Sequence, residues 1–446
     1  MGEGTGGLRE GLEKALARAG LAGPSEPARL TGGATMESWH FSAGGSDFVL
    51  RRAPSIEFMK DRPFGHASEA AVIEAAREAG VTAPEVISVL RESDGIGSGF
   101  VMRALPGTPD PRAIQAMPGQ DSILREAARD LARIHSLSRS NLPADIPVMD
   151  YGEAVERLCE QFDEAGGDRP IIALGLRWLL DNLPGPVEPV LNHGDFRLGN
   201  LLAEDGHLTG VLDWELAHFG DWHEDLAFGC MPVWRFGAYE SPALGMGSLE
   251  DYFATYEAEG GRTVDPARFR FWTIYRTVWW ALGCLKMASY WRSGEDRMLE
   301  RVVISRRTSE QEVDLLLLLE EDAPDEEKAE PVALPDMFAL TGEASDGEIA
   351  IAVAEWLTTI KDRVEGHDRF QLAVARNALG MIARSQASEV HVTDTGFAEA
   401  LLAGELDLAS PGLLAELRGA ALAKLSADVP KYPSLAVARA NWLRED

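Results

Sequence analysis

The 446-residue chain contains little cysteine. Its three cysteines, Cys159, Cys230 and Cys284, lie far apart and lack Cys-x-x-Cys spacing. An odd number in such a pattern argues against a disulfide framework and against a cysteine-based zinc site. Free thiols are typical of a reducing compartment, so we expect the protein in the cytoplasm.

Basic residues and long apolar runs are also scarce. Lys and Arg number 42 against 72 Asp and Glu, a formal net charge of −30. Such a surface repels a phosphate backbone, which disfavours nucleic-acid binding. The most apolar stretch, residues 271–291, is interrupted by Arg276 and Lys286, short of the roughly 20 uncharged residues that a spanning helix requires. The N-terminus shows no apolar signal-peptide core. We therefore expect a soluble protein with no membrane and no nucleic-acid partner.

The order of periodic patterns predicts a sheet-rich first part and a helical second part. Residues 28–52 alternate glycine turns with β-type runs, which indicates a small antiparallel meander. Helical spacing over residues 68–79 and a strand at 100–102 follow. Beyond residue 120 most apolar residues recur at helical spacing, apart from a strand-rich stretch at 187–213. This order is typical of an α+β protein.

The segment 320–330 holds seven acids and one base, which is the composition of a solvated linker. Ser345 to Glu348 has capping-box spacing ahead of an apolar pattern that runs to Val364, with Gly366 expected at the end of that helix. Further helices are predicted near 368–385, 396–404 and 411–426. The tail is therefore predicted to be a separate helical bundle.

Oxygen-bearing side chains gather around the strand-rich stretch. Two apolar strands joined by an Asp-Gly turn at 205–206 predict a hairpin, with Asp195 and Asn200 before its first strand and Asp213 after its second. The hairpin brings these three side chains to one rim. Phosphoryl transfer uses such a set, with a carboxylate for the hydroxyl proton and hard oxygen ligands for Mg²⁺. A metallohydrolase with His193, Asp195 and Asp213 as ligands is an alternative, although the other histidines are scattered.

The motif His193-x-Asp195-x4-Asn200, followed by Leu-Asp-Trp-Glu at 212–215, resembles the catalytic loop and metal aspartate of the aminoglycoside phosphotransferase and choline kinase family. The resemblance implies a two-lobed, protein-kinase-like fold that binds ATP and Mg²⁺ between its lobes. Asp195 would orient the acceptor hydroxyl or take its proton. Asn200 and Asp213 would be the magnesium ligands, and His193 would be a structural member of the catalytic loop. By the same resemblance, Asp225 would brace this loop through hydrogen bonds to its backbone.

The same resemblance implies an order of domains. We expect a small antiparallel-sheet N-lobe at residues 1–105 and a mainly helical C-lobe at 106–319. An acidic linker at 320–335 and an α-helical accessory domain at 336–446 would follow. The pattern Val-Leu-Arg-Arg before Pro at 49–54 is similar to the branch linked to acyl-CoA dehydrogenases.

Matches upstream of the catalytic loop imply the nucleotide contacts. Arg51 stands where many kinases have a phosphate-binding Lys, and guanidinium can hold phosphate with two hydrogen bonds. Met36 and Arg103 depart from the usual family residues at their positions. Adenine would be recognised by backbone groups at the hinge between the lobes. The residues expected to bind the nucleotide are Gly32, Gly33 and Thr35 in a glycine turn, Arg51 with its partner Glu69, and the hinge residues Met102, Arg103 and Leu105.

The sequence leaves the acceptor alcohol open. Overall acidity suits a cationic acceptor of the aminoglycoside or choline type. Residues 276–307, however, carry seven bases and three acids, which suits an anionic acceptor such as a hydroxyacyl-CoA or a hydroxyacid. The aromatic residues of this segment either line an acyl or nucleotide groove or belong to the core, in which case its arginines pair with the acidic linker. These residues are Trp279, Trp280, Tyr290 and Trp291.

A second class of function is a catalytically silent nucleotide-binding scaffold that acts through the helical tail. In either class the tail could contact a dehydrogenase partner or a second copy of the chain. The presence of Asp195, Asn200 and Asp213 together favours the enzyme.

Overall fold

The computed structural model describes residues 4–30, 36–53, 59, 62–260, 262–296, 298–332, 346–386 and 394–443. They form two compact units. Unit 1 comprises the chain up to Asp150 together with residues 186–269, and unit 2 comprises residues 151–185 together with the chain from Arg270. This division runs differently from the predicted domain boundaries, which stay a prediction.

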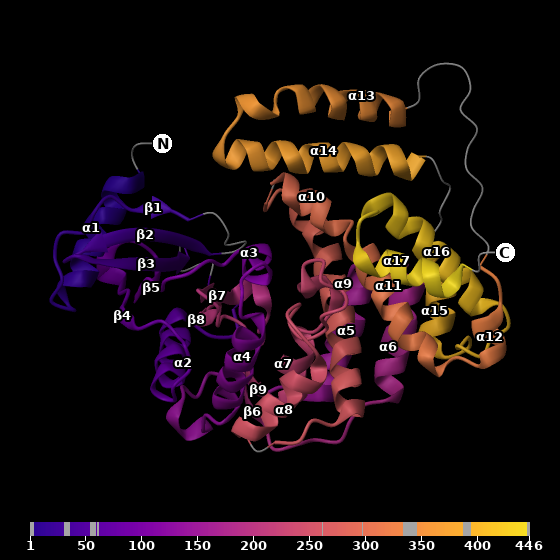
Figure 1. Cartoon of the computed structure of the whole chain (residues 1–446), viewed down its shortest axis with the longest axis horizontal. Helices are drawn as coiled ribbons and strands as arrows, with labels where there is room; N and C mark the ends of the chain where they lie inside the picture. Colours follow the sequence, from indigo (N-terminus) through magenta and orange to yellow (C-terminus); the bar gives the residue numbers. More distant parts are fainter. Residues whose placement is uncertain are drawn as a thin grey trace. The chain divides into compact units, whose positions relative to one another are not determined.

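A five-stranded antiparallel sheet opens unit 1 (Figure 1). Helix α1 (Gly4–Ala17) packs its Leu8 and Leu12 against this sheet, and α2 (His66–Glu78) follows the third strand. The arrangement confirms the predicted meander, the predicted helix and the predicted strand at 100–102. The strands, in their order across the sheet, are β1 (Ala28–Arg29), β2 (Glu37–Ala43), β3 (Ser46–Ala53), β5 (Ser98–Arg103) and β4 (Val86–Val89).

The rest of unit 1 joins helices to two short two-stranded sheets. Strands β7 and β8 pair antiparallel around the Asp205-Gly206 turn, which confirms the predicted hairpin, and β6 pairs with β9. A single core holds α2, α4, α8 and the hairpin together. The elements are α3 (Pro111–Gln115), α4 (Gln120–His135), β6 (Val190–Asn192), β7 (Leu201–Glu204), β8 (His207–Val211), β9 (His218–Gly220), α7 (Trp222–Phe228) and α8 (Leu249–Gly260).

Unit 2 is helical throughout its described residues. Its helices are α5 (Tyr151–Glu164), α6 (Pro170–Asp181), α9 (Pro266–Ser293, whose first turn belongs to unit 1), α10 (Leu299–Ser305), α11 (Thr308–Leu319), α12 (Asp325–Ala329), α13 (Asp346–Thr359), α14 (Gly366–Gln386), α15 (Thr395–Ala403), α16 (Leu413–Asp428) and α17 (Pro433–Trp442). None of the described helices is long and apolar enough to cross a membrane.

The acidic segment is more structured than its composition indicates. Glu320 accepts hydrogen bonds from Arg418 and from the indole of Trp442, and Glu327 accepts one from the backbone N–H of Gly412. The acidic composition predicted a solvated linker. These two acids instead bind residues about 85 to 120 positions later in the sequence, which composition cannot indicate. The segment is therefore packed against the tail helices.

The first tail helix is shorter than predicted. It ends at Thr359, and Gly366, with φ of +55°, opens α14 instead of closing the preceding helix. The capping residue Ser345 lies outside the described residues. Helices α13 and α14 run side by side (Figure 1). Much of the apolar face of α13 stays in solvent, because Ile349 is 54% exposed and Trp356 is 60% exposed.

Candidate active site

The loop between β6 and β7 is shaped by Gly194. Its φ is +82°, and a Cβ at this position would lie 2.3 Å from the carbonyl oxygen of Leu216, so only glycine fits. The backbone N–H groups of His193 and Gly194 donate to Asp225 at 2.6 and 2.8 Å, which confirms the predicted bracing contacts. Burial opposes ionisation of Asp225, but hydrogen bonds from His135 and from the loop outweigh it and lower its pKa to about 2. The loop is therefore tied to a permanent buried charge.

Asp195 is held by two side chains of its own loop. One carboxylate oxygen accepts from Nε of Arg197 at 2.7 Å, and the other accepts from Nδ2 of Asn200 at 2.6 Å. Burial raises the pKa of Asp195 to about 6, against the opposing charge of Arg197, and the nearby Asp213 carboxylate adds to the rise. A general base works best when its pKa lies near the operating pH. Asp195 is therefore an oriented carboxylate whose pKa lies near neutral pH, as a general base would require.

His193 is fully buried, and its ring packs against Phe196 and Trp214. Its Nδ1 accepts from the backbone N–H of Asp195 at 3.2 Å. Burial lowers its pKa to about 4, so the imidazole is neutral at pH 7. Within the described residues, no three His, Cys, Asp or Glu side chains form a metal-binding group. The buried, aromatic surroundings of His193 therefore give no support to the alternative of a metallohydrolase with His193 as a metal ligand.

Arg51 on β3 lies at the centre of a carboxylate cluster. Its Nε is 3.1 Å from Glu69 on α2, and its Nη2 is 2.7 Å from Asp213 and 2.9 Å from Glu215. Arg62 is 3.7 Å from Glu215. Burial raises the pKa of Glu69 to about 7 against the charge of Arg51, and the other two carboxylates add to the rise. Among the described residues, three carboxylates face two guanidinium groups when all of them are ionised.

The residues after β8 bring oxygen donors together. Asp213 has a φ of +71°, in the left-handed region that non-glycine residues rarely adopt. The backbone N–H of Leu212 donates to the carbonyl of Asn200 at 2.9 Å, which joins the two segments. Since Asn200 uses its amide nitrogen on Asp195, its amide oxygen remains to accept. That oxygen and the carboxylates of Asp213 and Glu215 are the donors that Mg²⁺ prefers, so the residues fit this ion.

The remaining predicted nucleotide contacts vary in placement. Gly32, Gly33 and Thr35 lie outside the described residues. At the predicted hinge, the N–H of Arg103 donates to the carbonyl of Glu85 and the N–H of Ala104 donates to that of Asp47. The Arg103 side chain pairs with Glu85 at 2.7 Å. Met102 and Leu105 are both half-buried.

Three charged residues of this site were missed by sequence reasoning: Arg62, Arg197 and Glu215. A signal existed for two of them, because Arg197 lies two residues after Asp195, and Glu215 lies two residues after Asp213. For Arg62 we find no local signal, since its contact with Glu215 joins segments more than 150 residues apart.

Comparison with known proteins agrees with this geometry. The model of the phosphotransferase enzyme family, APH, matches residues 27–272, more than half of the chain. A mouse protein named acyl-CoA dehydrogenase family member 10 is 31% identical over 259 residues, or 52% of this chain and 24% of the mouse protein. An aminoglycoside 3'-phosphotransferase of Escherichia coli is 27% identical over 149 residues, or 32% of this chain and 53% of that protein. The matched parts thus span about a quarter to a half of these relatives.

A solved structure shares the fold. The putative aminoglycoside phosphotransferase of Ralstonia eutropha superposes with a TM-score of 0.57 at 20% identity, over 69% of this chain and 97% of that one. The predicted α+β, kinase-like fold is thereby confirmed, as is the helical region that follows it. The matched family segment contains Arg51, Asp195, Asn200 and Asp213. The chain therefore belongs to the phosphotransferase enzyme family.

Proposed function

We propose that the protein is an ATP- and Mg²⁺-dependent kinase that transfers the γ-phosphoryl group to the alcohol of a small molecule. The observation that carries this proposal is the half-buried Asp195, oriented by Arg197 and Asn200 beside the carboxylate of Asp213. A base, oxygen ligands and a phosphate-binding cation in one site are the parts that phosphoryl transfer requires.

Each residue has a role in this proposal. Asp195 orients the acceptor hydroxyl and takes its proton, while Asn200 and Asp213 hold Mg²⁺. When bound, the ion would supply positive charge against the phosphates. Arg51 would hold a phosphate oxygen, and Glu69 keeps its guanidinium in place. Positioning and electrostatics supply most of the acceleration in such reactions.

For the acceptor we propose a hydroxyacyl-CoA or a hydroxyacid, and for the location the cytoplasm. Support for the acceptor comes from the mouse relative, whose name is that of an acyl-CoA dehydrogenase. An aminoglycoside or choline-type alcohol is the alternative, supported by the shorter match to the bacterial aminoglycoside phosphotransferase.

The test is a panel of candidate acceptors with ATP and Mg²⁺, with ADP release measured and the phosphorylated product identified by mass. The panel holds hydroxyacyl-CoAs, free hydroxyacids, choline and aminoglycosides. We expect turnover with a hydroxyacyl-CoA or a hydroxyacid. Turnover with an aminoglycoside alone would overturn the acceptor. Magnesium-dependent ATP binding without turnover on any alcohol would favour the silent scaffold.

A partner at the helical tail stays a proposal as well, with a dehydrogenase or a second copy as the occupant. It is supported by the exposed Ile349 and Trp356 on α13 and by Phe370 on α14, which is 54% exposed. Light scattering on the intact protein tests the second copy. A dimer that Trp356→Glu dissociates is expected, and a monomer at all concentrations would contradict it.

A further inference from the structure

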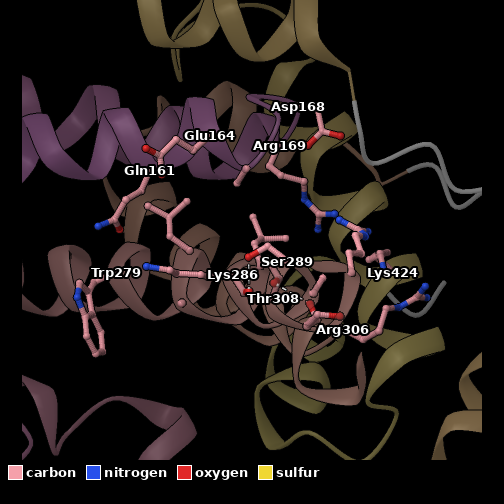
Figure 2. A pocket seen from close by; sticks show the side chains of 17 residues that line it. Gln161, Glu164, Asp168, Arg169, Trp279, Lys286, Ser289, Arg306, Thr308 and Lys424 are labelled. Carbon is pink, nitrogen blue, oxygen red and sulfur yellow. Dashed lines mark hydrogen bonds between the residues drawn. The ribbon is translucent and has the colours of Figure 1, made fainter. Parts of the chain in front are cut away.

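Unit 2 contains a pocket of about 860 Å³ that takes no part in the site described above. Its walls come from the end of α5, the loop before α6, the second half of α9, the junction of α10 and α11, and α16. Figure 2 shows Trp279 and Lys286 toward one end and Arg169, Arg306 and Lys424 toward the other. The volume is that of a small-molecule site.

The lining is basic in a chain that is strongly acidic. Five bases line the pocket, against the two acids Glu164 and Asp168. The bases are Arg169, Lys286, Arg292, Arg306 and Lys424. A concave surface of one sign concentrates ligands of the opposite sign, so this pocket favours anions.

The carboxylates that pair with these bases lie beneath the surface. Arg169 is bound to Glu312, and both Arg306 and Lys424 are bound to Asp428. Both acids are 0% exposed, whereas the Arg306 side chain is 40% exposed and that of Lys424 is 17% exposed. Three cations thus share two buried carboxylates, with Asp168 of the lining as a further negative charge near Arg169.

Lys424 is repelled by the neighbouring cations of this arrangement. Burial lowers its pKa, and the charges of Arg306 and Arg169 lower it further, against the attraction of Asp428. An anion in the pocket would offset this repulsion. At the other end, Lys286 is exposed and lies 5.7 Å from the ring of Tyr290, and the indole of Trp279 forms part of the wall. The guanidinium of Arg276 lies over this indole at 4.9 Å from the ring centroid, so a flat ring would contact the part that faces the pocket.

We propose that this pocket binds a phosphate-bearing aromatic compound of the nucleotide type, with its phosphates on Arg306 and Lys424 and its ring toward Trp279. Most of the lining follows residue 272, where the family match ends, and Lys424 comes from the helical tail. The tail therefore completes a binding site that the shared phosphotransferase segment lacks.

Two sources offer this chemistry. One is the adenosine phosphate part of an acyl-CoA acceptor, and this source rests on the proposed function. The other is a free nucleotide that acts as an effector. Both present phosphate groups on a ribose that carries a flat base, so direct binding to the pocket is tested first and turnover second.

The probe is adenosine 3',5'-bisphosphate, titrated into the full chain by calorimetry. Because the compound also resembles ATP, binding is measured in wild type and in Asp213→Ala, whose predicted nucleotide site is damaged. We expect binding in both. Lys286→Glu, which replaces an exposed base of the pocket lining by an acid, should weaken binding of this anionic probe about tenfold or more. Lys361→Glu, the same change at an exposed position outside the pocket, should leave it unchanged.

Arg306→Gln and Lys424→Met should weaken binding as well, but both residues join helices, so a loss is accepted only where circular dichroism matches wild type. If these two variants fail to fold, the Lys286→Glu variant still tests the proposal, because Lys286 is exposed. Binding that Asp213→Ala abolishes, or that Lys286→Glu leaves unchanged, would overturn the proposal. No binding at millimolar probe would overturn it too.

Binding of coenzyme A (CoA) then distinguishes the two sources, an acyl-CoA acceptor and a free nucleotide effector. If CoA binds at least as well as the probe, and Lys286→Glu raises KM for an acyl-CoA acceptor without changing kcat, the acceptor is the source. If CoA fails to bind while the bisphosphate binds and alters ATP turnover, an effector is the source. Because binding is measured without turnover, an inactive enzyme that still binds the probe would contradict the proposed function and leave the pocket in place.

Discussion

The two charged clusters of this chain use the same kinds of side chain in opposite proportion. Around Arg51 in unit 1, three carboxylates face two guanidinium groups, and around Asp428 in unit 2, three cations face two carboxylates. With all of these groups ionised, carboxylates are in excess among the named residues of the first cluster and cations among those of the second. The first is suited to an added cation and the second to an added anion.

The clusters also differ in which sign is hidden. In unit 1 the central Arg51 side chain is 12% exposed while Asp213 is 33% exposed, so the carboxylate faces outward. In unit 2, Glu312 and Asp428 are fully buried, whereas the bases that they bind line the cavity. Under the two proposals above, ligand preference follows the sign of the exposed side chains, which the net charge of −30 does not predict.

The largest effect is expected from removing the proposed general base, Asp195, next to the first cluster. Asp195→Asn keeps the shape and removes the proton acceptor, so kcat should fall by about 100- to 10,000-fold, the range for a general base. ATP affinity should remain near that of wild type. Asp205→Asn in the exposed hairpin turn is the matched control and should keep full activity. Normal turnover in Asp195→Asn would contradict the assignment.

The second prediction removes the cation that balances the carboxylates. Arg51→Met removes the guanidinium group that contacts all three of these buried or half-buried carboxylates, so the free energy of unfolding should fall by about 3 to 5 kcal/mol. Nucleotide binding should be lost as well. Urea denaturation and ATP titration measure the two effects. Arg51→Lys, which keeps the charge, should lose less of both, and equal losses in the two variants would refute the electrostatic explanation.

The third prediction uses pH. Protonated Asp195 cannot accept a proton, so kcat/KM should be flat above about pH 6 and fall about tenfold per unit below it, as its pKa of about 6 requires. Arg197 lowers this pKa, so Arg197→Met should move the acid limb to higher pH. A limb that stays in place would show that Arg197 has only a structural role.

The smallest effect is expected from removing one negative charge at the pocket of the second cluster. Glu164 is an exposed acid at the pocket, so Glu164→Gln should tighten binding of adenosine 3',5'-bisphosphate about two- to fivefold, the range for an exposed charge. Glu160→Gln, one turn earlier on α5 and outside the pocket lining, is the control. Equal effects of the two changes would mean that only long-range charge acts.

Much of unit 1 was predictable because its signals are local. The Asp-Gly turn specified the β7–β8 hairpin, and the spacing of Asp195, Asn200 and Asp213 around it indicated their convergence before any coordinates. The bracing role of Asp225 followed from the family resemblance. Roles for Arg197 and Glu215 were missed although both lie beside predicted residues, since their meaning depends on which atoms they reach.

The tail was less predictable. Helix positions followed from apolar spacing. The apolar pattern of α13 also predicted that this face is buried, but Trp356 on it is exposed. The arginines near residue 306 were expected, in one alternative, to pair with the acidic linker. Instead, Arg306 binds Asp428, and Glu320 of that linker binds Arg418. Pairing over such distances has no signature in a single sequence.

By itself, the sequence determined the order of the elements, the motif of the loop between β6 and β7 and the family, because hydrophobic periodicity, turn residues and motif spacing act over a few neighbouring residues. Only the tertiary structure decided the charge balance at each cluster, the exposure of α13 and the pocket that α16 completes. The physical reason is that burial and ion pairing depend on side chains brought together from distant segments, and their energies change sign with exposure.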